Sequence, residues 1–181
     1  GLLEEIQVAP EHFRNRQLIG LDGVDVVAIR AQVRAEEGEV LEGEQSVRYS
    51  QQWLWSDGVP VAGMTPVLVR DAATGVSISE FVDDQPLDLL PYGLDEPVGR
   101  LWLEDIQGEV IEVQFGALGE PEIGLEGGVS PRRFVRVEGA EPVYLIDARL
   151  LDRIQDLVRE GNRRDEQNLE RSPRLNGADV V

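Results

Sequence analysis

Turn-forming residues interrupt this chain at short intervals, and their spacing limits most of it to short strands. Gln107-Gly108 separates the apolar stretches 101–106 and 110–115, and a glycine beside a polar residue is a strong hairpin signal. Similar signals recur along the chain, at Asp22-Gly23, 36–39, Ser56-Asp57-Gly58 and 138–141. We therefore expect hairpins, in which neighbouring strands run antiparallel, with one of them turning at Asp22-Gly23.

Apolar and polar residues alternate in several of these stretches. Ile111, Val113 and Phe115 would share one face of a strand, with Glu112 and Gln114 on the other. Few spacers are long enough for the crossover helices that parallel strands require. The pattern predicts an α+β fold, mainly antiparallel sheet built from hairpins, with two helices and a flexible C-terminal tail.

The first helix is expected over 66–74. Pro66 suits the first helical turn, where its missing N–H has no partner in any case. Thr65 precedes it as a candidate cap, since its hydroxyl oxygen can accept a backbone N–H. Gly75 is placed to end the helix in a left-handed conformation.

The second helix is expected over 148–160. Its apolar residues recur every three or four positions and form one face, namely Leu151, Ile154, Leu157 and Val158. Asp147 is the candidate N-cap and Gly161 the expected end. Another short helix is expected over 2–7. We therefore assign residues 1–161 to a single α+β domain, and the polar residues 162–181 to a disordered tail that begins as a frayed helix.

The charge balance excludes several classes of function. The 181 residues include 35 Asp and Glu and 17 Arg, for a net charge of −18, with no Lys, no Cys and one His. Without Cys or Lys the chain has no thiol nucleophile, disulfide or Schiff-base lysine. The negative charge opposes general binding to nucleic acid. The apolar runs are too short to cross a bilayer, and no signal peptide is visible.

No residue is assigned a catalytic, cofactor-binding or metal-binding role. His12 lacks a motif that would supply an orienting acid. The acidic run at 36–44 lacks the spacing of a calcium loop, and the glycines at 124–128 do not precede a helix that could hold a phosphate. We expect Asp83-Asp84 to lie in a loop, and we expect a basic cluster to pair with the chain's own acids, namely Arg132, Arg133 and Arg136.

The tryptophans leave two interpretations open. Trp53 and Trp55 stand two positions apart, so on a strand they share a face. They can pack on the core or cover a sheet edge, or they can form an exposed stacking platform. The second interpretation makes the protein a carbohydrate or small-ligand binding module. A hydrolase that uses paired carboxylates ranks last, because among 35 acids some pair would have suitable spacing by chance.

Three stretches of the chain resemble one bacterial family. The most specific is Tyr92-Gly93-Leu94-Asp95-Glu96-Pro97, where glycine and proline also favour a sharp turn. The others are strand patterns, at 13–21 with 24–29 and at 133–137 with 142–146. Together they resemble a domain-of-unknown-function family found in auxiliary components of gliding-motility-type ABC transporters, over roughly residues 11–155.

This resemblance implies an extracytoplasmic, periplasmic domain beside a membrane protein. The family has no agreed catalytic residues, so none is transferred to this chain. Its common N-terminal membrane helix has no counterpart here, and we expect any anchor of the full-length protein to lie upstream of Gly1. The expected function is that of a non-enzymatic accessory or interaction domain without a cofactor, whose partners are subunits of a transporter or envelope assembly.

Overall fold

The computed structural model describes residues 14–36, 38 and 40–172. Within them the fold is α+β, as expected, with two helices and a mostly antiparallel sheet. The strands are β1 (Val26–Val33), β2 (Gly43–Ser50), β3 (Gln52–Trp55), β4 (Ile78–Asp83), β5 (Gly99–Asp105), β6 (Val110–Leu118), β7 (Glu122–Ile123), β8 (Val129–Ser130), β9 (Arg132–Val137) and β10 (Val143–Asp147). The helices are α1 (Thr65–Gly75) and α2 (Arg149–Arg171), with 3-10 turns η2 (Gly23–Asp25) and η3 (Leu90–Tyr92).

Eight strands form one sheet in the order β3-β2-β1-β5-β6-β9-β10-β4. Every neighbouring pair is antiparallel, and three pairs are hairpins at positions predicted from the turns: β1–β2, β5–β6 and β9–β10. The strands β7 and β8 form a separate two-stranded hairpin. Strand β4 comes before β5 in the chain but lies at the far edge, beside β10.

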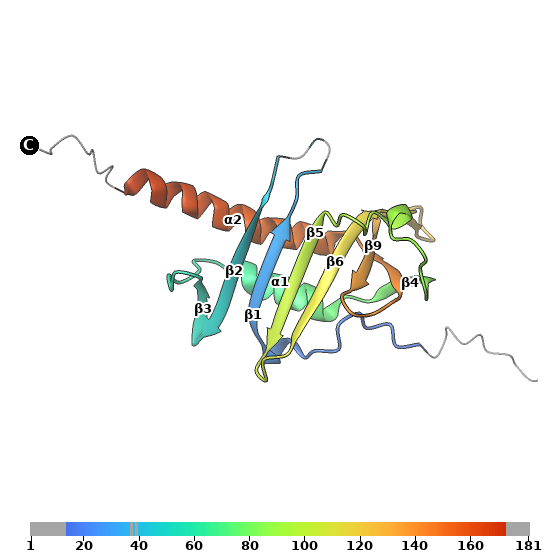
Figure 1. Ribbon diagram of the computed structural model, residues 1–181, viewed down its shortest axis with the longest axis horizontal. Helices are drawn as coiled ribbons and strands as arrows, with labels where there is room; N and C mark the ends of the chain where they lie inside the picture. The colour runs from blue at the N-terminus through green and yellow to red at the C-terminus, as the bar shows by residue number, and fades with distance from the viewer. Residues whose placement is uncertain (1–13, 37, 39, 173–181) are drawn as a thin grey trace, which may run out of the picture.

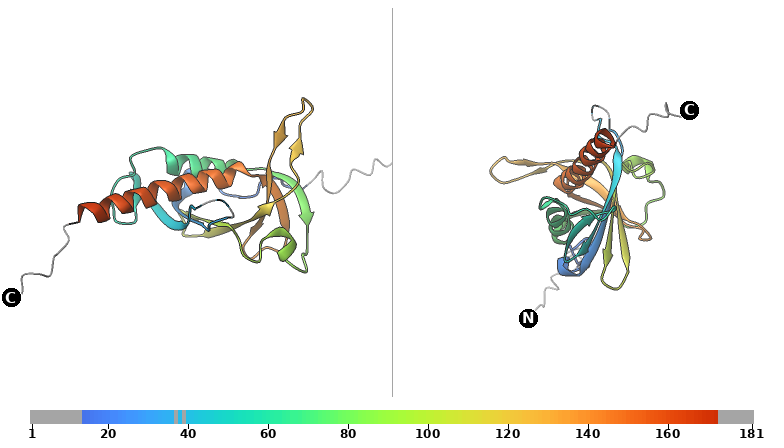
Figure 2. Two further views of the ribbon diagram at one scale, coloured as in Figure 1. Left: turned by 90° about the horizontal axis from the view of Figure 1, so that it is seen from above. Right: turned by 90° about the vertical axis from the view of Figure 1, so that its left-hand side faces the viewer.

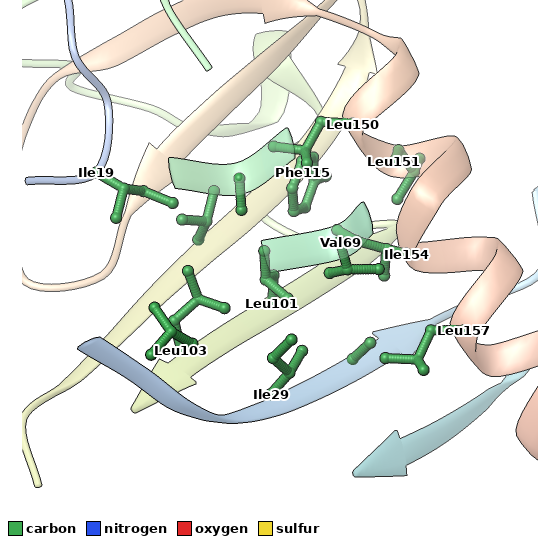
Figure 3. Packing of buried hydrophobic residues seen from close by; sticks show 14 of the residues in the cluster. Ile19, Ile29, Val69, Leu101, Leu103, Phe115, Leu150, Leu151, Ile154 and Leu157 are labelled. Atoms are coloured by element: carbon green, nitrogen blue, oxygen red, sulfur yellow. The ribbon is translucent and has the colours of Figure 1, made fainter. Parts of the chain in front are cut away.

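Both helices cover the same face of the sheet, and the opposite face stays open along β3, β2, β1 and β5 (Figures 1 and 2). The core fills the layer between helices and sheet. Phe115 of β6, Leu101 of β5 and Ile154 of α2 are completely buried there (Figure 3). Burial follows alternation closely on β5, where every second residue is buried from Gly99 to Asp105. This is the arrangement of an antiparallel sheet with one solvated face.

Helix α2 begins close to its predicted start but does not end at Gly161. The N-cap position is held by Ala148 and not by the predicted Asp147, and it has no side-chain capping bond. Asp147 ends β10, and its carboxylate accepts the backbone N–H of Arg149 at 2.9 Å. The helix then continues through Gly161 to Arg171. Residues 162–171 of the predicted tail are therefore helical, and 173–181 lie outside the described residues, as does the helix predicted over 2–7.

Gly161 has a packing role instead. A Cβ at this position would overlap the Cγ and Cδ atoms of Gln45 from β2. The Gln45 amide donates to Asn162 at 3.1 Å and to Asp165 at 2.9 Å. Asn162 in turn donates to the carbonyl of Glu42 at 2.9 Å. Because β2 holds the helix at this point, the glycine marks a close approach of helix and strand rather than a helix end.

Three local predictions were wrong in detail. Thr65 is the first residue of α1 and makes no capping hydrogen bond. Gly75 is the last helical residue and is not left-handed, and the helix ends where Val76 becomes extended. Asp22-Gly23 does not turn a hairpin. The Asp22 carboxylate accepts the N–H of Val24 at 3.2 Å and starts the turn η2, because aspartate competes well for nearby backbone donors.

Candidate functional site

The open face of the sheet carries a regular array of charged and polar side chains. On β1 the residues facing it are Ala28, Arg30 and Gln32, which alternate with the core residues. Paired residues of neighbouring strands share a face, so the strand register determines which side chains meet. The register places two rows of side chains across β2, β1, β5 and β6, and each row contains an arginine and a glutamate.

The first row runs from Ser46 through Arg30 and Trp102 to Glu112. The Arg30 guanidinium lies over the Trp102 ring at 3.8 Å from its centroid. The indole N–H of Trp102 donates to Glu112 at 2.9 Å. On the other side, Arg30 Nε is 3.9 Å from a carboxylate oxygen of Glu44. These contacts hold the Arg30 guanidinium against the Trp102 ring on the open face of the sheet.

The second row runs from Arg48 through Ala28 to Glu104. Arg48 donates to Glu104 at 2.8 Å, so the ion pair spans the small side chain between them. The Arg48 side chain is 59% exposed and that of Glu104 is 30% exposed. An exposed pair of this kind is worth only about 0–1 kcal/mol, and a ligand can displace it at little cost.

The two rows border a hollow of about 540 Å³ on the open face. Its walls combine the two arginines and Glu104 with apolar groups from β3, β5 and β6, namely Leu54, Trp102 and Val110. Small side chains of β1 and β2, among them Ala28 and Ser46, line it as well. Hollows of this size that are partly apolar and carry a few polar groups are typical of small-ligand sites.

Trp53 and Trp55 do not form an exposed platform. They are 7% and 4% exposed and belong to the core, which agrees with the first interpretation of the pair. Arg164 of α2 lies over the Trp55 ring at 5.5 Å and pairs with Asp57. The expectation of an exposed platform on these two tryptophans is therefore wrong. Trp55 and Trp102 both line the hollow, but Trp55 is almost completely buried.

A second candidate feature is the β7–β8 hairpin, which projects away from the body of the molecule (Figure 2). Three of its apolar side chains are largely exposed: Ile123 at 73%, Leu125 at 109% and Val129 at 65%. The acidic residues Glu120 and Glu126 lie beside them in sequence. An exposed apolar group on a projecting element is typical of a protein interaction site.

Two arginines of the predicted basic cluster pair with acids of the chain, whereas Arg136 donates to the carbonyl of Ala140 at 3.0 Å. Arg133 is buried, donates to the Gly116 carbonyl at 2.6 Å and pairs with Glu36 at 3.1 Å. Arg132 pairs with Glu80 at 3.2 Å. The cluster therefore stabilises the far end of the sheet. Of the acidic run, Glu37 and Glu39 lie outside the described residues, as does His12.

Asp83 and Asp84 lie where β4 ends and also serve the fold. Tyr92 donates to Asp83 at 3.0 Å, and this hydrogen bond raises the pKa of the phenol. Arg14 forms two hydrogen bonds with Asp84, at 2.8 and 2.9 Å, and these lower the pKa of that carboxyl. The neighbouring Gly93 has φ of +64°, and a Cβ there would lie 2.8 Å from the Ala117 nitrogen. The Tyr92–Pro97 segment thus has a structural role in this turn.

Sequence reasoning missed Arg30, Arg48 and Glu104. The position of Arg30 could have been predicted, because this arginine interrupts an aliphatic stretch whose alternation is typical of a half-buried strand. That these three side chains lie close together could not have been predicted, since it depends on the strand register across β2, β1 and β5.

Within the described part of the chain, no helix is long and apolar enough to span a membrane. Those residues also contain no group of three or more His, Asp or Glu side chains arranged to hold a metal ion. Comparison of the chain with protein-family models, with curated proteins and with solved structures finds no match.

Proposed function

We propose that this chain is a non-enzymatic, extracytoplasmic interaction domain that docks through its β7–β8 hairpin onto a subunit of a membrane transporter or envelope assembly. The observation that carries the proposal is the projecting hairpin with exposed Ile123, Leu125 and Val129. The sequence resemblance to auxiliary components of ABC transporters supports the location and the kind of partner.

The energetics of the hairpin favour a protein partner. Full burial of an exposed aliphatic side chain stabilises a complex by about 1.5–3 kcal/mol, so three of them can anchor an interface. Glu120, Glu122 and Glu126 surround these side chains in the sequence, on a chain whose net charge is −18. The fitting partner therefore has an apolar groove bordered by basic residues, and the acidic surface speeds its association.

An affinity pull-down from native membranes tests this proposal. Residues 1–181 serve as bait at low and moderate salt, and mass spectrometry identifies the partner. The double variant Ile123→Ser/Leu125→Ser removes the apolar anchor. Leu87→Ser is the matched control, because Leu87 is equally exposed but lies on the loop before η3.

We expect wild type and the Leu87→Ser variant to recover the same transporter or envelope subunits, with recovery falling as salt rises. The hairpin variant should lose them by at least about 100-fold, because it removes two aliphatic contacts that are each worth about 1.5–3 kcal/mol when buried. Equal recovery by all three baits would place the docking surface elsewhere. Recovery of no membrane subunit would contradict the proposed function itself.

A further inference from the structure

We propose that the hollow on the open face binds a small aromatic carboxylate between Arg30 and Arg48. This inference goes beyond docking through the hairpin and does not depend on it, since the hairpin and the hollow share no residues.

The walls of the hollow carry more positive than negative side chains, which favours an anionic ligand. In the whole chain acidic residues outnumber arginines by 35 to 17. The walls of the hollow reverse this ratio, with Arg30 and Arg48 against the single acid Glu104. Two further acids lie beside the hollow without lining it: Glu44, which pairs with Arg30 at 3.9 Å, and Glu112, which accepts the indole N–H of Trp102. Among the residues that line the hollow, one ligand carboxylate therefore balances the excess of one arginine over the acids.

The placement of the two guanidinium groups is the second argument. Arg48 pairs in register with Ala28, and Ser46 pairs with Arg30, so the arginines are diagonal neighbours on adjacent strands. Long side chains at diagonal positions reach one another. Each guanidinium can donate two parallel N–H groups to a carboxylate, which lysine cannot do. The Trp102 ring under Arg30 reduces the conformational freedom that binding would otherwise cost.

The apolar walls of the hollow favour a ligand whose carboxylate is attached to an aromatic ring. Leu54 lies at one wall, and Val110 and Trp102 lie at the other. The outer face of the stacked Arg30 guanidinium adds a flat cationic surface on which an aromatic ring can lie. A volume of about 540 Å³ accommodates a body of one or two rings. Because the site is open to solvent, we expect a dissociation constant on the order of 0.1–1 mM for such a ligand.

The test is a titration of the ¹⁵N-labelled chain with 1-naphthoate, followed by NMR. The matched probe 1-naphthamide has the same rings without the charge, and acetate has the charge without the rings. We expect naphthoate to shift the amide signals of β1, β2 and β5 around the hollow. Naphthamide and acetate should each bind at least about ten-fold more weakly, since each lacks one of the two interactions.

Two kinds of variant make the site itself testable. Arg30→Gln and Arg48→Gln should each weaken naphthoate about ten-fold, because each removes a charge-assisted hydrogen-bond donor. Ala28→Leu should abolish binding by filling the hollow while it keeps both charges. Arg153→Gln on α2 is the control, since that arginine is as exposed as Arg30 but lies on the helix layer. A thermal melt of each variant confirms that the fold is intact.

Several results would overturn the proposal. Equal affinity for naphthoate and naphthamide would show that the carboxylate is not recognised. Binding that survives both arginine variants, or signal shifts centred on another surface, would place the ligand elsewhere. An absence of saturable binding up to about 10 mM naphthoate, some ten-fold above the weakest expected constant, would exclude the site.

Discussion

The two faces of the sheet are built from the same strands but are held in different ways. On the covered face of β1, Ile29, Ala31 and Val33 are almost completely buried beneath the helices. On the open face of the same strand, Arg30 stacks on Trp102, and Ala28 lies beneath the ion pair of its neighbours. One period-two pattern therefore supplies both a core and a charged surface.

The difference in energy between the faces has a consequence for function. Burial of one large aliphatic or aromatic side chain contributes about 1.5–3 kcal/mol, whereas an exposed ion pair contributes about 0–1 kcal/mol. The covered face thus carries the stability of the fold. Side chains of the open face can change with little effect on folding, and this leaves that face available for binding.

The largest expected effect comes from breaking the covered face. Phe115→Ala removes a fully buried ring from the core. We expect the free energy of unfolding to fall by about 3–5 kcal/mol, because lost burial and the cavity left behind add together. Urea denaturation measures the change. Val110→Ala on the same strand is the control, since Val110 is mostly exposed and should change stability by less than about 0.5 kcal/mol.

The next effect tests where α2 contacts the sheet. Gly161→Ala should destabilise the protein by about 1–3 kcal/mol, because the new methyl group overlaps Gln45. Gly75→Ala in α1 meets no atom within 4 Å and should instead be neutral or stabilise by up to about 1 kcal/mol. Thermal or urea unfolding of both variants shows whether each substitution lowers or raises the stability. Stabilisation by Gly161→Ala, as ordinary helix propensity predicts, would contradict the close approach.

A smaller effect concerns the stack on the open face. A double-mutant cycle of Arg30→Ala and Trp102→Leu should give a coupling energy of about 0.5–1 kcal/mol, as for an exposed cation–π pair. Each single variant should keep the fold. A coupling energy above about 2 kcal/mol would show that the open face contributes to stability as the covered face does, and would remove the contrast between them.

The smallest effect depends on pH and lies where the sheet passes into α2. The hydrogen bond from the Arg149 side chain lowers the pKa of Asp147 below the usual 3.8, although partial burial acts in the opposite direction. A lowered pKa in the folded state means that the carboxylate stabilises the fold above pH 3.8 and that this contribution disappears as the pH falls through the lowered value.

Asp147→Asn should therefore be less stable than wild type by about 0.5 kcal/mol at neutral pH, or about 1–2 °C in Tm. The gap should close as the pH falls below 3.8, which thermal melts across the acid range can measure. Glu126→Gln on the projecting hairpin is the control, because it removes one negative charge away from the start of α2. A gap for Asp147→Asn that widens in acid would contradict the assigned direction of the pKa shift.

The candidate sites show how far local patterns reach. The alternation around Arg30 and the turn after Ile123 are visible in the sequence, as are the glycines of the hairpin. The burial of Trp53 and Trp55 is not, because a pair on one face of a strand can point to either side. The hollow is not visible either, since its walls come from strands that only register brings together.

The sequence by itself determined what depends on neighbouring residues. The period-two segments became strands, the turn signals at Gln107-Gly108 and 138–141 became hairpins, and the apolar stripe of 151–158 became the packed face of α2. These outcomes follow from the side-chain direction along a strand or helix, which is a local property.

The tertiary structure decided what depends on contacts across the chain. Only contact with β2, where Gln45 meets Asn162 across 117 positions, turned Gly161 from an expected helix end into a point of close approach. Only the order of the strands brought Arg48 to Glu104 and Arg30 to Trp102. The physical reason is that pairing and packing are settled by the burial of apolar surface over the whole molecule, and that energy is not a property of any single segment.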